Sequence, residues 1–309
     1  MSSDNVDFIN KCLRQWKGEF PLDERLQYFS DQFEDWLMQI PADSREIVKT
    51  LIFNMSYYSN ATSNKWLEML HKELLKQENV TNDNTIYAFL KSPDGLSNSS
   101  NDYWTNYKAI NRINSNLCVE NLDAIYPEQW ELIDNIVFID DFSGTGNTFI
   151  KELEKRPTTY SGKRIFFIAL NVMQLAIDKI NEFADEYDIK IIFLVSKIQH
   201  KAFERNLFTN DNEAKNNIEE MSTALGIPSN HILGYEETES LVSFYNNTPN
   251  NTLGFIRYDT QDYKSIFPRK NETKPAWQRF GSKKSRKAAN YNNKVLEGKK
   301  WPSIKKLYF

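Results

Sequence analysis

Two aspartates, Asp140 and Asp141, stand side by side where the apolar run NIVFI ends in the sequence NIVFIDD. Adjacent carboxylates repel each other. A ligand with neighbouring hydroxyl groups, or a bound divalent cation, offsets that repulsion. The pair therefore predicts a site for a sugar diol or for a cation.

The loop after the aspartates has the composition of a phosphate-binding turn. Gly144 and Gly146 let the backbone turn tightly and bring amide groups close to an anion. Thr145 and Thr148 add hydroxyl donors. A helical pattern follows at once, and its positive end is directed at the same place. The two segments together predict a sugar-diol contact beside a phosphate contact.

Three common motifs do not fit these residues. The sequence has no G-x-x-x-x-G-K-[ST] loop. Phe142 stands where a haloacid-dehalogenase loop needs its second Asp, and Phe149 stands where a dinucleotide fingerprint needs its last glycine. The plainer alternative is a strand that ends in a capped turn, with the aspartates as solvated caps.

The elements that position this loop alternate between two patterns. Short apolar runs rich in Ile, Val and Phe predict strands at 85–90, 135–140, 164–170 and 189–195. Helical patterns separate or follow them at 99–113, 147–155, 173–187 and 211–225. This alternation predicts an α/β fold with a parallel sheet, in which ligands gather at the carboxyl ends of the strands.

The flanking segments predict a helical N-terminal region at 1–80 packed on the core, an α/β domain at 81–268 and a basic tail at 269–309. Within the first, Asp43 and Glu46 form a capping box for a helix whose apolar face runs from Ile47 through Leu51 and Met55 to Tyr58. The apolar runs 241–245 and 252–258 flank a polar turn and predict a small additional strand pair. Residues 114–130 have an irregular pattern.

The composition is that of a globular protein: 40% of the 309 residues are hydrophobic and 26% are charged. No apolar run approaches the roughly 20 residues that span a bilayer, so we expect no membrane contact. The first twenty residues lack the apolar core of a secretory signal, and a cytoplasmic location is the default expectation. With Cys12 and Cys118 as the only cysteines, a disulfide framework is not expected.

The tail carries thirteen Lys or Arg residues and two Glu from Arg269 onward, a net charge of +11, which leaves −15 on the rest of the chain. It is either a solvated segment that wraps the acidic body or a contact for nucleic acid or an acidic protein. Aromatic residues interleaved with the basic ones offer stacking surfaces, namely Trp277, Phe280, Tyr291 and Trp301.

Residues Ile136 to Thr148 resemble the phosphoribosyl diphosphate motif of type I phosphoribosyltransferases: four hydrophobics, two acidic residues, three spacers and T-G-x-T. The resemblance implies a parallel sheet of phosphoribosyltransferase type. It implies that Asp140 and Asp141 contact the ribose hydroxyls and Mg²⁺, with Asp141 helping to stabilise the oxocarbenium-like centre. It places the 5′-phosphate on Ser143, Gly144, Thr145, Gly146, Asn147 and Thr148. Phe142, Ser143 and Gly144 depart from the common pattern of two aliphatic residues and a small one.

Further segments extend the resemblance. A pyrophosphate loop follows an earlier strand in that family, which assigns Lys91 and Ser92 to the diphosphate. The acceptor is expected on a hood built from 196–210, with Lys197, His200, Lys201 and Arg205, and from the turn at Asn246 to Asn251. The loops at 95–104 and 240–269 resemble phosphoribosyltransferase-like domains of bacterial conflict and antiphage systems, including some retron cassettes.

Three hypotheses follow for function. The first is an enzyme that transfers or removes a phosphoribosyl group with release or use of pyrophosphate, with Mg²⁺ as cofactor. The second is a catalytically silent protein that senses a nucleotide or phosphorylated sugar. The third is an accessory protein that acts on nucleic acid through its basic tail. The residues needed for binding and for turnover are the same, so the motif does not separate the first two hypotheses.

Overall fold

A computed structural model describes residues 3–18, 21–90 and 99–270 of the chain. Residues 1–269 form one compact unit, and residues 270–309 are a second unit. Residues 271–309 lie outside the described residues, and so does the predicted contact of the basic tail with nucleic acid or a protein.

The centre of the compact unit is a four-stranded sheet in the order β2-β3-β4-β5, with every neighbouring pair parallel. Its strands are β2 (Thr85–Phe89), β3 (Asn135–Ser143), β4 (Arg164–Met173) and β5 (Lys190–Gln199). In the register, Ile136 of β3 lies beside Ile86 of β2 and Ile165 of β4. The predicted parallel sheet is confirmed, and its Ile-, Val- and Phe-rich strands are those expected where both faces of a sheet are covered.

Three of the four strands run farther at their carboxyl ends than their apolar runs. The sequence prediction ended β3 at residue 140, β4 at 170 and β5 at 195, where polar residues begin. In the structure the ladder continues through Phe142 of β3, Asn171 of β4 and Lys197 of β5, which are paired across the sheet. Polar side chains remain in the sheet here because this edge faces the candidate site rather than the apolar layers.

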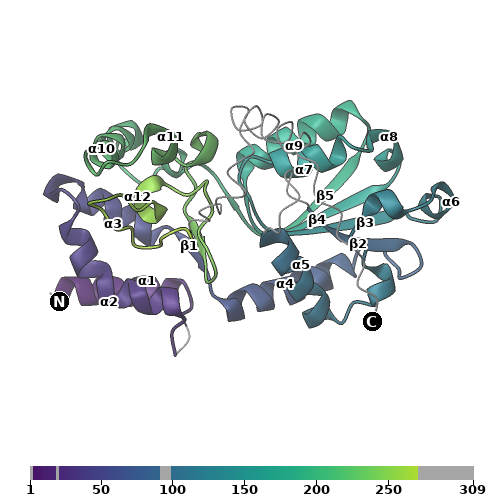
Figure 1. Cartoon of the computed structure of the whole chain (residues 1–309), viewed down its shortest axis with the longest axis horizontal. Coiled ribbons are helices and arrows are strands. Elements are labelled where there is room, and N and C mark those ends of the chain that lie inside the picture. Colours follow the sequence, from purple (N-terminus) through teal and green to yellow (C-terminus); the bar gives the residue numbers. More distant parts are fainter. Residues whose placement is uncertain (1–2, 19–20, 91–98, 271–309) are drawn as a thin grey trace, which may run out of the picture. The chain divides into compact units, whose positions relative to one another are not determined.

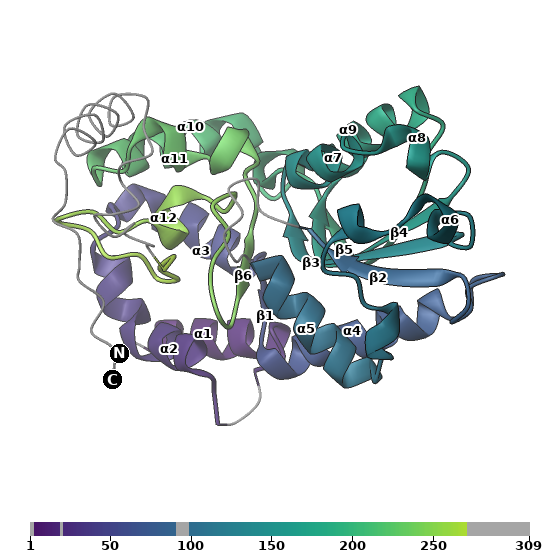
Figure 2. The same cartoon turned by 45° about the vertical axis from the view of Figure 1, so that its right-hand side comes forward.

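Helices cover both faces of the sheet, as Figures 1 and 2 show. One face packs against α7 (Asn147–Leu153) and α9 (Gln174–Glu186), with α8 (Pro157–Tyr160) beside them; the other packs against α4 (Asn60–Leu74) and α5 (Ser99–Asn111). Side chains of β3 alternate accordingly: Ile136 and Phe138 are buried on the α7 and α9 face. Val137 and Ile139 are buried on the α4 and α5 face.

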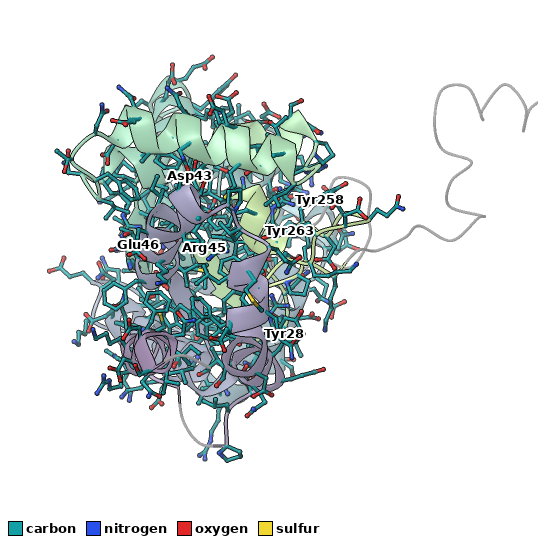
Figure 3. All side chains as sticks on the ribbon, turned by 90° about the vertical axis from the view of Figure 1, so that its left-hand side faces the viewer. Tyr28, Asp43, Arg45, Glu46, Tyr258 and Tyr263 are labelled. Atoms are coloured by element: carbon teal, nitrogen blue, oxygen red, sulfur yellow. The ribbon has the colours of Figure 1, made fainter. Side chains whose placement is uncertain are left out.

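A separate hydrophobic core joins the start of the chain to its later part, from Ile9 to Tyr57 and from Ala202 to Phe267. Its helices are α1 (Ser3–Gln15), α2 (Glu24–Met38), α3 (Arg45–Phe53), α10 (Asp211–Ala224), α11 (Ser229–Ile232) and α12 (Gly254–Arg257). Figure 3 looks onto this part, with the buried Tyr263 near its centre. The Trp36 indole donates a hydrogen bond of 2.8 Å to the Tyr263 hydroxyl, which joins the two segments.

The helix expected to reach Tyr58 ends earlier. α3 stops at Phe53, and Ser56–Tyr58 forms strand β1. The expected capping box is also absent, because no side chain caps α3 and Glu46 instead pairs with Lys49 at 3.1 Å (Glu46 is labelled in Figure 3).

The additional strand pair exists with a different partner from the expected one. β1 pairs in parallel with β6 (Val242–Phe244). The run at 252–258 makes an isolated bridge at Thr252 and then the short helix α12, so it is not the second strand. A parallel partner that lies far away in the sequence leaves no local signature, whereas a turn between two apolar runs suggests a hairpin.

The remaining elements are short. They are the 3₁₀ turns Ala42–Ser44, Ser115–Leu117, Leu122–Ala124, Ala202–Glu204 and Tyr235–Glu237, and the helix α6 (Pro127–Trp130). The irregular pattern predicted for 114–130 agrees with these isolated turns. None of the described helices combines the length and apolarity that crossing a bilayer requires.

Candidate functional site

The acidic pair lies near the carboxyl end of β3, with Asp140 beside Ala169 of β4 in the register. Both aspartates are only 7% exposed. The Asp141 backbone N–H donates to the Asp140 carboxylate over 2.9 Å. Burial, and then the neighbouring Asp141 carboxyl group, raise the pKa of Asp140 well above its usual range. Asp140 therefore holds a proton more readily than an ordinary aspartate, and a cation or a hydroxyl-rich ligand would favour its ionised form.

A buried serine that the sequence analysis did not single out links the pair to the end of β2. The Ser100 hydroxyl donates to the Ile139 carbonyl at 2.8 Å and accepts from the Leu90 backbone N–H at 3.0 Å. Leu90 is the last described residue before the segment that holds the predicted pyrophosphate loop. Ser100 thus fixes Leu90 beside Ile139, the residue that precedes Asp140. Lys91 and Ser92, assigned to the diphosphate, lie outside the described residues.

Two tyrosines also border the acidic pair. Burial raises the pKa of Tyr103 well above its usual value, and the Asp141 carboxylate raises it further. Burial also raises the pKa of Tyr245, and the carboxylates of Asp102 and Asp141 raise it further. Both phenols are therefore neutral at ordinary pH. Both tyrosines are far from Asp141 in the sequence, so the sequence alone did not reveal that they lie near it.

The glycine loop turns directly from the strand into α7. Ser143, Gly144, Thr145 and Gly146 are buried, whereas Thr148 is exposed. Gly146 has φ of +77° and is the N-cap of α7. A Cβ atom there would lie 3.0 Å from Ile180 and 3.1 Å from the Ala176 carbonyl of α9. A glycine is therefore required by both backbone conformation and space.

Two residues of the later chain cover the loop. A Cβ atom on Gly144 would lie 2.3 Å from the side chain of Asn251, so the two residues are packed closely. The Asn147 side-chain amide donates to both carboxylate oxygens of Glu236, at 3.0 and 3.2 Å. Access of a phosphate group to the buried amides of the loop thus requires Asn251 to move, and Glu236 places a negative charge beside the same turn.

The predicted hood residues are divided between different places. Asn251, from the turn at 246–251, reaches the glycine loop. Lys197 instead donates to the Ser56 hydroxyl at 2.8 Å, and Arg205 donates to the Asn54 carbonyl at 3.3 Å. His200 is exposed and Lys201 half-buried just beyond β5.

The acidic pair fits the minimal protein contribution to a Mg²⁺ site. Among the described residues, no group of three or more His, Cys, Asp or Glu residues could hold a metal ion. Mg²⁺ is commonly bound through one or two carboxylates, with water and substrate phosphate oxygens completing its shell. Asp140 and Asp141 supply the two carboxylates that such a shared site requires.

Comparisons with known proteins agree with this geometry. The family described as PRTase-CE matches residues 33–269. A parallel α/β sheet with an acidic pair and a glycine loop at the end of one strand is of the phosphoribosyltransferase type. Because the match covers most of the sequence, the chain belongs to the PRTase-CE family.

Solved structures similar to this chain include two phosphoribosyltransferases. The Helicobacter pylori xanthine-guanine-hypoxanthine phosphoribosyltransferase is 14% identical, with a TM-score of 0.31, over 46% of this chain and 88% of that one. The orotate phosphoribosyltransferase from Aeropyrum pernix is 9% identical, with a TM-score of 0.29, over 44% of this chain and 70% of that one. No curated protein matches the sequence at a significant level.

Proposed function

We propose that the carboxyl end of β3 binds phosphoribosyl diphosphate or a nucleotide, and that the protein transfers or removes the phosphoribosyl group with pyrophosphate chemistry. The observation that carries this proposal is the buried pair Asp140 and Asp141 directly before the glycine loop, in a chain of the PRTase-CE family.

The two parts of the site have different tasks in this proposal. Asp140 and Asp141 accept hydrogen bonds from the ribose hydroxyls, because ionised carboxylates accept and do not donate. The 5′-phosphate is held by backbone amides and hydroxyls of residues 143–148. In this proposal Asn251, which packs on Gly144, moves aside to admit it. Transfer breaks the bond between ribose C1 and the diphosphate, which leaves with the bonding electrons, and forms a bond from C1 to the acceptor.

Catalysis in such a site comes mainly from position and charge. Holding the sugar and the phosphate fixes C1 relative to the acceptor, and Asp141 offers a negative charge to the positive centre that develops there. Mg²⁺, held by Asp140 and Asp141 together with substrate oxygens, would neutralise the leaving diphosphate. The neutral phenols of Tyr103 and Tyr245 add no opposing charge.

The test compares the wild type with the double variant Asp140→Asn, Asp141→Asn. Purified protein is incubated with phosphoribosyl diphosphate, Mg²⁺ and pooled nucleobases and nucleotides, and pyrophosphate release is measured. We expect release by the wild type and a loss of at least about 100-fold in the variant, since removing one charge-stabilising group at a reacting centre has effects of this size. Asp134→Asn is the matched control, because Asp134 is exposed and just precedes the amino end of the same strand.

The outcomes separate the proposal from its alternative. Release that is equal in the wild type and the double variant would contradict the assignment of the site. Binding of phosphoribosyl diphosphate without release, lost in the same variant, would instead support a catalytically silent sensor.

The proposal extends to a role in bacterial conflict, which is supported by the loop resemblance at 95–104 and 240–269. Bacteria that express the wild type together with its neighbouring genes are challenged with phage, and plating efficiency is compared with that of the double variant. Protection that requires the two aspartates is the expected result. Equal plating efficiency of the phage on the wild type and on the double variant would contradict the role in conflict. It would not affect the proposed enzymatic activity.

A further inference from the structure

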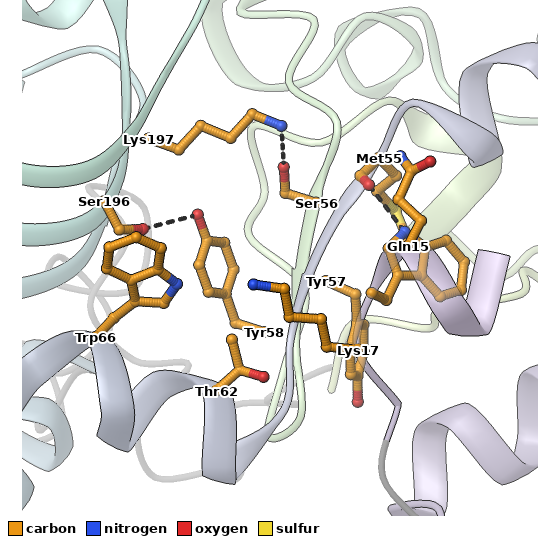
Figure 4. Close-up of a pocket in the computed structure, with 11 residues that line it drawn as sticks. Gln15, Lys17, Met55, Ser56, Tyr57, Tyr58, Thr62, Trp66, Ser196 and Lys197 are labelled. Carbon is orange, nitrogen blue, oxygen red and sulfur yellow. Dashed lines mark hydrogen bonds between the residues drawn. The ribbon is translucent and has the colours of Figure 1, made fainter.

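A cavity of about 160 Å³ lies near the carboxyl end of β5 (Figure 4). Its walls come from the end of α1, from β1, from the first turns of α4 and from β5. Figure 4 shows Lys17 and Lys197 extending into the space in front of Tyr58, with Trp66 on the far side of that ring. Lys17 and Trp66 belong to no motif in the sequence.

The cavity offers hydrogen-bond donors and positive charge. Its 11 lining residues include Lys17 and Lys197, together with Ser56 and Thr62, and no Asp or Glu. Among the described residues, neither lysine has an ion-pair partner. The Lys197 ammonium donates to a neutral hydroxyl, that of Ser56, at 2.8 Å. Two ammonium groups around one cavity without a carboxylate favour an anionic ligand.

The surroundings of Lys197 disfavour its charge, although the residue as a whole is exposed. Partial burial of the ammonium end lowers the pKa of Lys197, and the neighbouring Arg205 guanidinium lowers it further. An anion beside Lys197 would oppose both effects. Arg205 is itself held by the Asn54 carbonyl at 3.3 Å, an uncharged partner.

The cavity is distinct from the acidic pair. Between them lies a row of packed rings: Tyr58 stacks on Phe244 at 5.2 Å, and Phe244 contacts Tyr103 edge-on at 5.9 Å. The Tyr58 hydroxyl is fixed in this row by its 2.9 Å hydrogen bond to the Leu170 carbonyl of β4. Asp141 lies at the far end, where it raises the pKa of Tyr103.

The cavity has room for a small anion. Its volume of 160 Å³ is below the roughly 300–1,000 Å³ of a pocket that encloses a drug-sized molecule, and it opens to solvent. A phosphate group fits within it. A doubly charged phosphate matches two ammonium groups better than a singly charged carboxylate does.

We propose that this cavity is an oxyanion site in which Lys17 and Lys197 bind the phosphate group of a small ligand, separately from the site at the end of β3. The hydroxyls of Ser56 and Thr62 complete the contact, and Trp66 forms the wall beside it.

The tryptophans of the cavity provide a direct readout. Inorganic phosphate is titrated into the full-length protein up to about 10 mM, the range of weak single-group ligands, and tryptophan fluorescence is followed. We expect a saturable change that is lost in Trp66→Phe. In the double variant Lys17→Asn, Lys197→Gln we expect the apparent affinity to fall by about tenfold or more, because charge-assisted hydrogen bonds have been removed. Asparagine is chosen because Lys17 has φ of +54°.

Controls separate this site from the one at the end of β3. Lys190→Gln removes an exposed lysine from the opposite end of β5 and should leave the titration unchanged. The variant Asp140→Asn, Asp141→Asn should also keep the fluorescence change, so failure of the proposed enzymatic function leaves this inference testable. Acetate is titrated as a singly charged carboxylate for comparison, and it should bind more weakly than phosphate.

Two results would overturn the proposal: no saturable change with phosphate in the wild type, or equal phosphate affinity in the wild type and the lysine double variant. The melting temperature of each variant is measured alongside. A lysine double variant that does not fold is replaced by the single variant Lys197→Gln, whose side chain can keep a hydrogen bond to Ser56.

Discussion

The carboxyl ends of β3 and β5 lie two strands apart in one sheet and carry opposite charge. Near its end β3 carries two buried carboxyl groups, followed by a loop that Asn251 covers, whereas β5 carries near its end Lys197, an exposed lysine that faces a cavity without acids. At two strand spacings, about 10 Å, the two ends are near neighbours. The difference shows that one edge of a sheet can place buried carboxyl groups and a lysine-lined cavity only two strands apart.

The loop of β3 should be the more easily damaged of the two regions. Gly146→Ala forces a side chain into a left-handed conformation and against α9, with contacts of 3.0 and 3.1 Å. We expect a loss of about 2–3 kcal/mol in the free energy of unfolding, measured by urea denaturation, from strain and overpacking together.

The control for this substitution is Gly162→Ala. Gly162 has φ of +76° but nothing within 4 Å of the added Cβ. Gly162→Ala should lower the free energy of unfolding by about 1 kcal/mol, from backbone strain alone. Equal losses in both variants would show that the packing of Gly146 on α9 contributes little.

The raised pKa of Asp140 predicts a pH effect with a definite sign. Because the folded pKa lies above the unfolded one, the folded state binds the proton more tightly, and stability from this group declines as pH rises from the unfolded pKa through the folded pKa. Asp140→Asn removes the titration and should raise stability relative to wild type by about 1–2 kcal/mol at pH 8. The gain should shrink toward pH 4. Thermal melts of both proteins at each pH measure it; a constant difference would contradict the assignment.

Some features at the carboxyl ends of β3 and β5 could be predicted from the sequence, and others could not. The strands and the acidic pair were visible because an apolar run, two acids and a glycine turn are contiguous from Ile136 to Thr148. The turn that carries Asn251 was expected near the site because of its polar sequence, but the contact of Glu236, the link through Ser100 and the cavity around Lys17 were not visible. Each of these brings together residues that are far apart in the chain.

The same limit explains the error at β1. Tyr58 continues the apolar face of a helix when only spacing is considered, but Asn54 ends that helix and β1 finds its partner at Val242–Phe244. Tertiary pairing overrides a local helical pattern in such short segments.

The charge of Glu236 beside the β3 loop should weaken phosphate binding there. Glu236→Gln keeps an acceptor for the Asn147 amide and removes the charge, so affinity for phosphoribosyl diphosphate should rise about 2- to 10-fold, by calorimetry. Glu237→Gln, a neighbour that also has positive φ, is the control and should change little. Unchanged or lower affinity in Glu236→Gln would show that the carboxylate does not oppose the ligand.

The smallest expected effect concerns stability at the β5 end. Lys197 is exposed and has no described ion-pair partner, so Lys197→Gln should change the free energy of unfolding by no more than about 0.5 kcal/mol in urea denaturation. A larger loss of unfolding free energy would mean that the hydrogen bond from Lys197 to Ser56 stabilises the fold. The β5 end would then resemble the β3 end in its sensitivity to substitution.

The core that joins Ile9–Tyr57 to Ala202–Phe267 has a consequence for synthesis on the ribosome. The first helices emerge early, but the residues that bury their apolar faces are made only after the whole sheet has been translated. During that interval Phe29 and Trp36, buried in the finished protein, lack the later rings that they stack on, Phe267 and Phe255. Newly made chains should therefore depend on chaperones until residue 267 has left the exit tunnel.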